Sequence, residues 1–209
     1  MKQMIKDLIS SGALKTPRII EAFQRIDRKD FLLEEYKDEA YVNAPLSIGY
    51  GQTISQPLTV AFMLELLQPQ EGNKILDIGS GSGWQTALLA DIVGDSLTCE
   101  GRVFAIEIIP ELANFGRKNV SKYNFIKKGI VKFFNINGAN GLLEEAPFDR
   151  IIAAATGEEI PRAWKEQLKI GGRLVAPVKD SIQLLVKKED NVFEEQSYSG
   201  FAFVPFVDN

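Results

Sequence analysis

The sequence predicts a doubly wound α/β domain, with a mostly parallel sheet of about seven strands and short helices added at its amino-terminal end. Residues 74–93 show the clearest pattern, because an apolar run of strand length leads into a glycine-rich turn and then into helical spacing. Strand-like and helical patterns alternate after it, and the chain ends in two closing strand-like runs. Such alternation is typical of a parallel sheet that helices cover on both faces.

The chain before this pattern is predicted to be mainly helical. Residues 2–11 and 16–26 carry apolar side chains at helical spacing, and residues 30–36 add a third short helix. Residues 40–50 lose this periodicity and are dense in proline, glycine and asparagine, so we expect an irregular loop. A helix over residues 58–67 then precedes the first strand of the sheet.

After the glycine-rich turn, strands and helices follow each other in order. The predicted strands span residues 102–106, 131–136, 149–154, 173–178, 182–187 and 196–204. The predicted helices span residues 110–123 and 161–168, with Gly171 and Gly172 ending the second, and a turn is expected at residues 187–191. No repeat or linker divides the chain, so we expect one domain over residues 1–209, with helices and a loop in 1–57 and the sheet core in 58–209.

The glycine-rich turn indicates a ligand at the end of the first strand. Asp77 is followed by Gly79, Gly81 and Gly83, and glycines let a backbone turn tightly and approach a ligand closely. A dinucleotide site would need the spacing G-x-G-x-x-G, and Trp84 stands where its third glycine would lie. The spacing therefore argues against a nicotinamide cofactor, and a turn without any ligand is the alternative.

Glu107 stands at the carboxyl end of the predicted strand 102–106. A carboxylate in that place can accept hydrogen bonds from both hydroxyls of a ribose, which suits a nucleoside-containing ligand. A solvated charge at a strand end is the other interpretation.

Composition excludes several classes of chemistry. The chain has no histidine and one cysteine, Cys99, which excludes Ser-His-Asp and Cys-His machinery and argues against a zinc or iron site. The net charge of −4 argues against a broad nucleic-acid surface, and no stretch predicts a signal peptide or a membrane span. A single cysteine fits a reducing compartment, so we expect a cytoplasmic protein without nucleic-acid or membrane partners.

Residues 51–57 lead into the predicted helix 58–67. Ser55 precedes Pro57 by two residues, which is typical of a helix N-cap followed by proline at the start of the helix. The local pattern favours a cap, and a capping serine can also have a functional role.

The stretch APLSIGYGQTISQP at residues 44–57 resembles the signature of the protein-L-isoaspartate O-methyltransferases, which methylate isoaspartyl residues in aged proteins. The resemblance covers roughly residues 16–207. Residues 19–23 and 31–41 are similar to the family's amino-terminal helices, and the glycine turn and residues 147–152, 167–177 and 203–206 follow in family order. The TISQP core at residues 53–57 is specific, whereas many methyltransferases share the glycine turn.

The resemblance implies the fold of methyltransferases that use S-adenosyl-L-methionine (SAM), with an antiparallel element near the carboxyl end. It implies SAM as cofactor without a metal, isoaspartyl proteins and peptides as substrates, and we expect a monomer. The residues predicted to bind the cofactor are Asp77, Gly79, Ser80, Gly81, Gly83, Glu107, Asn137 and Gly138. Those predicted to bind the substrate are Thr53, Ile54 and Ser55, and Ser55 is the predicted catalytic residue.

Two places depart from the family pattern. Asn137 stands where the family usually has an aspartate that recognises the adenine amino group; an amide oxygen can also accept that hydrogen bond, while Asn137-Gly138 also fits an ordinary turn. Ala153 and Ala154 stand where the family favours a small residue and a threonine, which weakens any assignment of substrate contacts to that loop.

The implied reaction suits a chain without histidine. The free α-carboxylate of an isoaspartyl residue has a pKa near ~3.5, so the nucleophile is ionised at neutral pH and needs no base. A dry pocket favours a reaction in which a cation and an anion neutralise each other, and alignment supplies most of the acceleration. The methyl ester should then cyclise to a succinimide that reopens partly to aspartate. A SAM methyltransferase acting on tRNA or a small molecule, and a catalytically silent SAM-binding protein, are the competing hypotheses.

Overall fold

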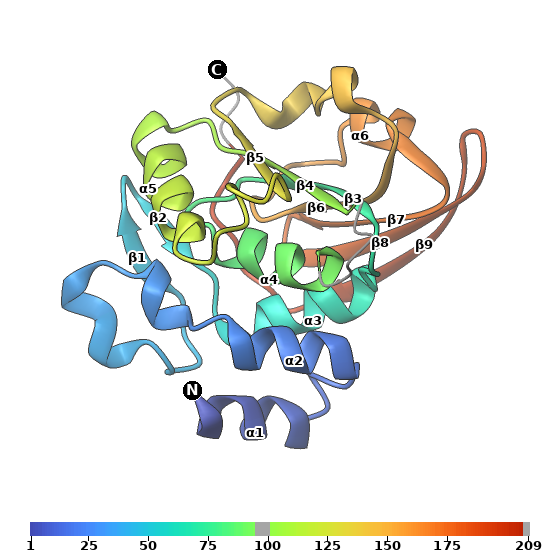
Figure 1. The fold of residues 1–209 in the computed structure, drawn as a ribbon. Helices are drawn as coiled ribbons and strands as arrows, with labels where there is room; N and C mark the ends of the chain where they lie inside the picture. Colours follow the sequence, from blue (N-terminus) through green and yellow to red (C-terminus); the bar gives the residue numbers. More distant parts are fainter. Residues whose placement is uncertain (95–100, 207–209) are drawn as a thin grey trace.

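The computed structural model describes residues 1–94 and 101–206, and its centre is one seven-stranded sheet (Figure 1). The strands are β3 (Lys74–Ile78), β4 (Arg102–Ile106), β5 (Val131–Phe134), β6 (Phe148–Ala153), β7 (Leu168–Val178), β8 (Ser181–Glu189) and β9 (Val192–Ser199). They lie in the order β5-β4-β3-β6-β7-β8-β9; β3 to β7 are parallel, and β8 and β9 are antiparallel to their neighbours. The predicted fold class, including the antiparallel element, is confirmed.

Helices cover both faces of this sheet. Figure 1 shows α3 (Pro57–Leu67) and α4 (Trp84–Val93) on one face, with α1 (Lys2–Ser10) and α2 (Pro17–Arg25) beyond them. On the opposite face lies α6 (Arg162–Glu166). Strand side chains alternate between two buried clusters, because successive residues of a strand point to opposite faces. Ile75 and Val103 pack with α1 to α4 and with α5 (Pro110–Ser121), whereas Leu76 and Phe104 share a cluster with Trp164 of α6.

The amino-terminal helices α1 and α2 confirm two predictions, but the third helix is wrong. The chain forms two 3₁₀ helices there, η1 (Arg28–Phe31) and η2 (Glu34–Glu39), separated by Leu32 and Leu33 in extended conformation. Phe31 is fully buried and stacks on Tyr123, with ring centroids 5.9 Å apart. This packing sets the path of the chain and outweighs the local helical spacing.

The irregular loop expected at residues 40–50 is only partly correct. Its second half forms β1 (Leu46–Gly49), which pairs antiparallel with β2 (Gln52–Ile54) in a separate two-stranded sheet. The hairpin turns through three successive residues with positive φ, Gly49, Tyr50 and Gly51 (88°, 55° and 70°). The glycines that suggested a loop are those that close the hairpin, because L-residues rarely adopt positive φ.

The carboxyl-terminal boundaries also differ from the expectation. Helix α6 ends at Glu166, and Gly171 and Gly172 lie inside the long strand β7 instead of ending a helix. Strand β8 continues to Glu189 and β9 begins at Val192, so the turn expected at 187–191 is shorter than predicted. Strand β9 ends at Ser199 instead of residue 204. The sequence also predicts a surface loop over residues 94–101. Cys99 and most of this loop lie outside the described residues.

Gly83 fixes how closely α4 approaches α5. Its φ is +86°, and a Cβ atom there would lie 2.8 Å from Val120 Cγ2 and 2.9 Å from the Gly116 oxygen. Gly116 is the reciprocal half of this contact, since its own Cβ would lie 2.7 Å from the Gly81 oxygen. The third glycine of the turn is therefore required by helix packing.

Gly83→Ala should lower the free energy of unfolding by about 2 to 4 kcal/mol, because overpacking adds to the strain of a positive φ. Gly51→Ala is the matched control: Gly51 has φ +70° with nothing within 4 Å of an added Cβ, so only the backbone term of about 1 to 2 kcal/mol applies. Urea unfolding of both variants measures the difference. Equal losses would show that the α4–α5 contact does not depend on Gly83.

Candidate active site

The glycine turn after β3 is held against the end of β4 by main-chain hydrogen bonds. The N–H groups of Gly79 and Ser80 both donate to the Ile106 oxygen, at 2.9 and 3.0 Å. Gly79 and Gly81 have φ values of +76° and +51°, which only glycine adopts without strain. The turn thus wraps the carboxyl edge of the sheet, where open α/β sheets bind ligands.

Glu107 follows β4 directly and is 6% exposed. One carboxylate oxygen accepts the Gly81 N–H at 2.9 Å, and the other accepts the Ile109 N–H at 3.0 Å. Each oxygen keeps a lone pair for a further donor. Glu107 therefore fixes the glycine turn and still presents a carboxylate to a ligand.

A cleft opens beside these residues, at the edge of the sheet where the strands end. Six segments distant in the sequence form its walls: the β1–β2 hairpin, the turn after β3, the turn after β4, Gly138 after β5, the loop after β6, and the carboxyl-terminal segment. The lining residues are Ile48, Gln52, Thr53, Ile78, Gly79, Gly81, Ile106, Glu107, Ile108, Ile109, Gly138, Ala154, Ala155, Val204, Pro205 and Phe206. Five of the predicted site residues meet here.

A second cavity adjoins this cleft. Its walls include Ser55, Pro45 and the segment from Gly200 to Pro205, and it shares Thr53, Ala154, Val204 and Pro205 with the first. A small third cavity between them is lined by Thr53, Ile54, Ser55, Gly79, Ser80 and Gly81, among others. The structure therefore brings the glycine turn together with Thr53–Ser55, called the TIS segment below, although Ser55 and Gly81 are 26 residues apart in the sequence.

The capping interpretation of Ser55 is wrong. Helix α3 begins at Pro57 with Gln56 at the N-cap position, and no cap side chain bonds to its first turn. The N–H of Leu58 instead donates to Asn43 Oδ1 at 2.9 Å, so an asparagine from the preceding loop does the capping. Ser55 lines the second cavity and does not cap the helix.

Asp77 is fully buried and lines none of these cavities. Gln85 Nε2 and Thr86 Oγ1 donate to its two oxygens at 2.8 and 2.5 Å, which ties the end of β3 to the first turn of α4. Burial, reinforced by the nearby charge of Glu107 and opposed by these hydrogen bonds, raises the pKa of Asp77 to about 6. Asp77 and Gly83 therefore support the glycine turn from the side away from the cavities, and neither lines them.

Ser80 and Asn137 differ in how their polar atoms are used. Ser80 Oγ is buried next to the small cavity and has no hydrogen-bond partner among the described residues. Asn137 Oδ1 accepts the Ala139 N–H at 2.8 Å and thereby caps η3 (Gly138–Asn140), so the turn interpretation of Asn137-Gly138 describes its local structure. An amide oxygen can accept a second donor, and Gly138 beside it lines the cleft.

Several residues that line the cleft were not predicted as site residues from the sequence. Ile48 and Gln52 of the hairpin and the segment Val204 to Phe206 line the cleft, although residues 203–206 entered only as part of the family resemblance. The carboxyl-terminal segment is held by two main-chain bonds, from Thr156 N–H to the Val204 oxygen at 2.9 Å and from Phe206 N–H to the Thr156 oxygen at 2.7 Å. No local sequence signal indicates this pairing.

Over residues 1–94 and 101–206, no group of three or more His, Cys, Asp or Glu side chains could hold a metal ion. In the same part of the chain, no helix combines the length and apolar character that crossing a bilayer requires.

The whole chain, residues 1–209, matches the family model of protein-L-isoaspartate(D-aspartate) O-methyltransferase. The chain belongs to this family. Curated members show the same likeness over nearly full length: the protein-L-isoaspartate O-methyltransferase of Methanopyrus kandleri is 40% identical over 210 residues, covering 99% of this chain and 90% of that protein. The Aeropyrum pernix enzyme is 42% identical over 209 residues, covering 98% of this chain and 78% of that protein.

Solved structures agree on the fold. A crystal structure described as a protein-L-isoaspartate O-methyltransferase of Plasmodium falciparum, in complex with S-adenosyl-L-homocysteine, superposes with a TM-score of 0.88 at 23% identity. It covers 100% of this chain, and 98% of that chain is matched. The family and the SAM-dependent methyltransferase fold predicted from the sequence are confirmed, and the chain is a protein carboxyl methyltransferase of the isoaspartate family.

The raised pKa of Asp77 makes stability depend on pH in a definite direction. The folded state binds the proton of the Asp77 carboxyl group more tightly than the unfolded chain does. The contribution of this proton to the free energy of unfolding is therefore full below about pH 4 and is lost as the pH rises through about 6. Between pH 4 and pH 7 the wild type should lose about 2 to 3 kcal/mol relative to Asp77→Asn. Urea unfolding of both proteins across this range measures it, and a difference that does not change with pH would contradict the prediction.

Proposed function

We propose that the cleft at the glycine turn holds SAM and that the adjoining cavity holds an L-isoaspartyl residue of a damaged protein, whose free α-carboxylate takes the methyl group. The observation that carries this proposal is that Thr53 and Ala154 line both spaces. A cofactor in one and a substrate in the other would meet at that shared wall. The methyl ester formed would begin the repair that the family resemblance implies.

The residues of the cleft fit the cofactor. Gly79 leaves room beside the turn, since the nearest atom to an added Cβ there is 3.9 Å away. Ser80 Oγ is buried without a partner among the described residues and could bond to the amino-acid end of the ligand. Glu107 would accept from the ribose hydroxyls, and Asn137 with Gly138 would lie at the adenine. When bound, SAM supplies the electrophilic methyl group. Asp77 and Gly83, which do not reach the cleft, would act by fixing the turn.

The substrate side needs orientation and little proton transfer. The hydroxyl groups of Thr53 and Ser55 would donate to the carboxylate oxygens and hold one of them in line with the methyl carbon. The carboxylate is already ionised at neutral pH, so the site needs no base, in agreement with a chain that contains no histidine. The apolar walls from Ile54 and from Phe201 to Val204 would exclude water, which strengthens the attraction between the reacting charges.

The rest of the proposal comes from the sequence. We expect a monomer of one domain that acts on isoaspartyl proteins and peptides in the cytoplasm, without nucleic-acid or membrane partners. The net charge of −4 supports the absence of a nucleic-acid partner. Size-exclusion chromatography with light scattering measures the oligomeric state.

Matched peptides test the function. The protein is incubated with methyl-labelled SAM and two peptides that differ only in isoaspartate or aspartate at one position. The proposal expects base-labile label in the isoaspartyl peptide alone. Transfer to tRNA or to a small molecule offered in place of the peptides would favour a methyltransferase of another substrate, and SAM binding without any transfer would favour a silent binding protein.

Ser55→Ala should lower kcat for the isoaspartyl peptide by about ten- to several-hundredfold, because loss of a donor to an anion costs roughly 1.5 to 3 kcal/mol and misalignment adds to it. Since Asn43 and not Ser55 caps α3, the melting temperature should hardly change. Ser121→Ala is the control, because its exposed hydroxyl donates to the Arg117 oxygen and Ser121 does not line the cleft or the adjoining cavities. Normal turnover of Ser55→Ala at saturating SAM would remove Ser55 from catalysis.

Glu107→Gln should weaken SAM binding by about ten- to hundredfold, the equivalent of roughly 1.5 to 3 kcal/mol for a hydrogen bond to a charged group. The amide keeps the shape of the carboxylate but places an NH₂ group against a main-chain donor. Isothermal titration calorimetry with SAM measures the affinity, and Glu145→Gln, which removes surface ion pairs with Lys74 and Lys132, is the control. Equal SAM affinities for the wild type and Glu107→Gln would place the ribose elsewhere.

A further inference from the structure

Arg28 lies under the TIS segment and is fully buried, with 0% of its surface exposed. Its guanidinium donates to four main-chain oxygens. Nη1 bonds to Ala40 at 2.9 Å and Val42 at 3.2 Å, and Nη2 bonds to Ala44 at 2.9 Å and Ser55 at 3.2 Å. One side chain from η1 thus joins the loop before β1 to the residue predicted to align the substrate.

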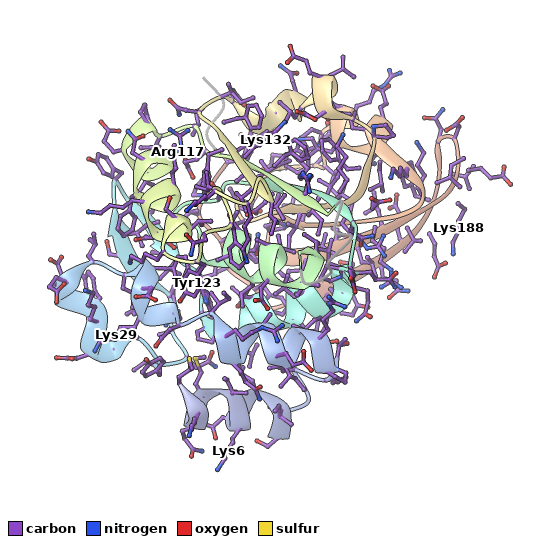
Figure 2. The ribbon with its side chains drawn as sticks, viewed as in Figure 1. Lys6, Lys29, Arg117, Tyr123, Lys132 and Lys188 are labelled. Atoms are coloured by element: carbon purple, nitrogen blue, oxygen red, sulfur yellow. The ribbon has the colours of Figure 1, made fainter. Side chains whose placement is uncertain are left out.

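The charge of Arg28 has no counter-charge in the described structure. Over residues 1–94 and 101–206 no carboxylate forms an ion pair with it, and its Nε atom is buried without a hydrogen-bond partner. Burial lowers the pKa of Arg28 to about 10, so the guanidinium stays protonated at neutral pH. Surface cations are arranged differently: Figure 2 shows Lys6 and Lys188 at the edges of the molecule, extending away from the ribbon.

An unpaired buried cation is costly, and structures usually keep such groups paired. The ring of Trp84 offers a partial compensation, with the guanidinium carbon 5.4 Å from the ring centroid. Trp84 is also one of the residues that line the small cavity beside Ser55 and Gly81. The guanidinium therefore contacts two residues, Ser55 and Trp84, that line the small cavity beside the candidate reaction site.

We propose that Arg28 is a positioning residue that fixes the Ser55 segment and also a specificity-determining residue, whose unneutralised charge makes the substrate cavity prefer an α-carboxylate over its neutral derivatives. The inference rests on the proposed function of the two cavities. A carboxylate bound at the Ser55 hydroxyl would provide the counter-charge that the fold lacks. Screening by salt would be weak, because the wall between the two groups is buried.

Methyl transfer would then remove the attraction. The carboxylate oxygen forms its bond to the methyl carbon with its own electron pair, the sulfur–carbon bond breaks with its pair going to sulfur, and no proton moves. The product ester is neutral, so Arg28 would hold the substrate and favour release of the product. Hydrogen bonding explains the path of the loop, and the proposal adds what the charge itself does at the neighbouring cavity.

The test compares binding of an anion with binding of a neutral analogue. Dissociation constants are measured for an isoaspartyl peptide and for the same peptide with its isoaspartyl α-carboxylate replaced by a carboxamide, both in the presence of S-adenosyl-L-homocysteine. In the wild type the anion should bind more tightly. The preference is the dissociation constant of the carboxamide peptide divided by that of the carboxylate peptide. Arg28→Gln should reduce this ratio by about tenfold, the effect expected of one charge across a partly polar wall. Arg28→Lys, which keeps the charge but not the planar fork, should keep the ratio within about threefold while kcat falls.

Arg173→Gln is the matched control, because Arg173 also donates to a main-chain oxygen, that of Leu66, at 2.8 Å and away from the substrate cavity. It should leave the ratio unchanged. An unchanged ratio in folded Arg28→Gln would overturn the proposal. If Arg28→Gln does not fold, Arg28→Lys decides, because loss of the preference in a variant that keeps the charge would also overturn it. If the wild type does not methylate the isoaspartyl peptide, the proposed function itself fails, whatever the ratios.

Discussion

The site depends on the bonds that tie the glycine turn to the end of β4. The Ile106 oxygen accepts two successive N–H groups of the turn, and the carboxylate of the next residue, Glu107, accepts a third from Gly81. These bonds hold the turn open at the carboxyl edge of the sheet. There β4 lies on one side of β3 and β6 lies on the other, which is where open α/β sheets bind ligands. Without them the main chain could close over the cleft.

Buried ionisable groups surround this turn. Asp77 stands behind it with a raised pKa, Glu107 stands beside it, and Arg28 lies under the neighbouring TIS segment. Each has a cost in desolvation free energy, and each is held by several hydrogen bonds that offset part of that cost. A reaction between a sulfonium and a carboxylate requires placed charges and exclusion of water more than it requires a titrating base, which agrees with a chain that has no histidine.

Segments from the two ends of the chain complete the walls. The β1–β2 hairpin contributes Ile48 and Thr53, and the carboxyl-terminal segment contributes Val204 to Phe206 through its pairing with Thr156. Both border the cleft at the glycine turn and the adjoining cavity. The sheet therefore fixes the proposed cofactor side, whereas the proposed substrate side is assembled from extensions that the sheet supports.

The sequence by itself determined the sheet, the glycine turn and the family, because these depend on local apolar runs, on glycines at positive φ and on the TISQP motif at residues 53–57. It predicted Glu107, Gly79, Gly81 and Gly138, all of which line the cleft. Tertiary structure decided the rest, since the deciding partners are distant in sequence. Asn43 caps α3 in place of Ser55, Gly83 serves the contact with Gly116, and the carbonyl oxygens that Arg28 binds converge only when the loop folds back over η1. Hydrogen bonds and contacts between distant residues leave no periodicity or spacing in the sequence, so only the folded chain reveals them.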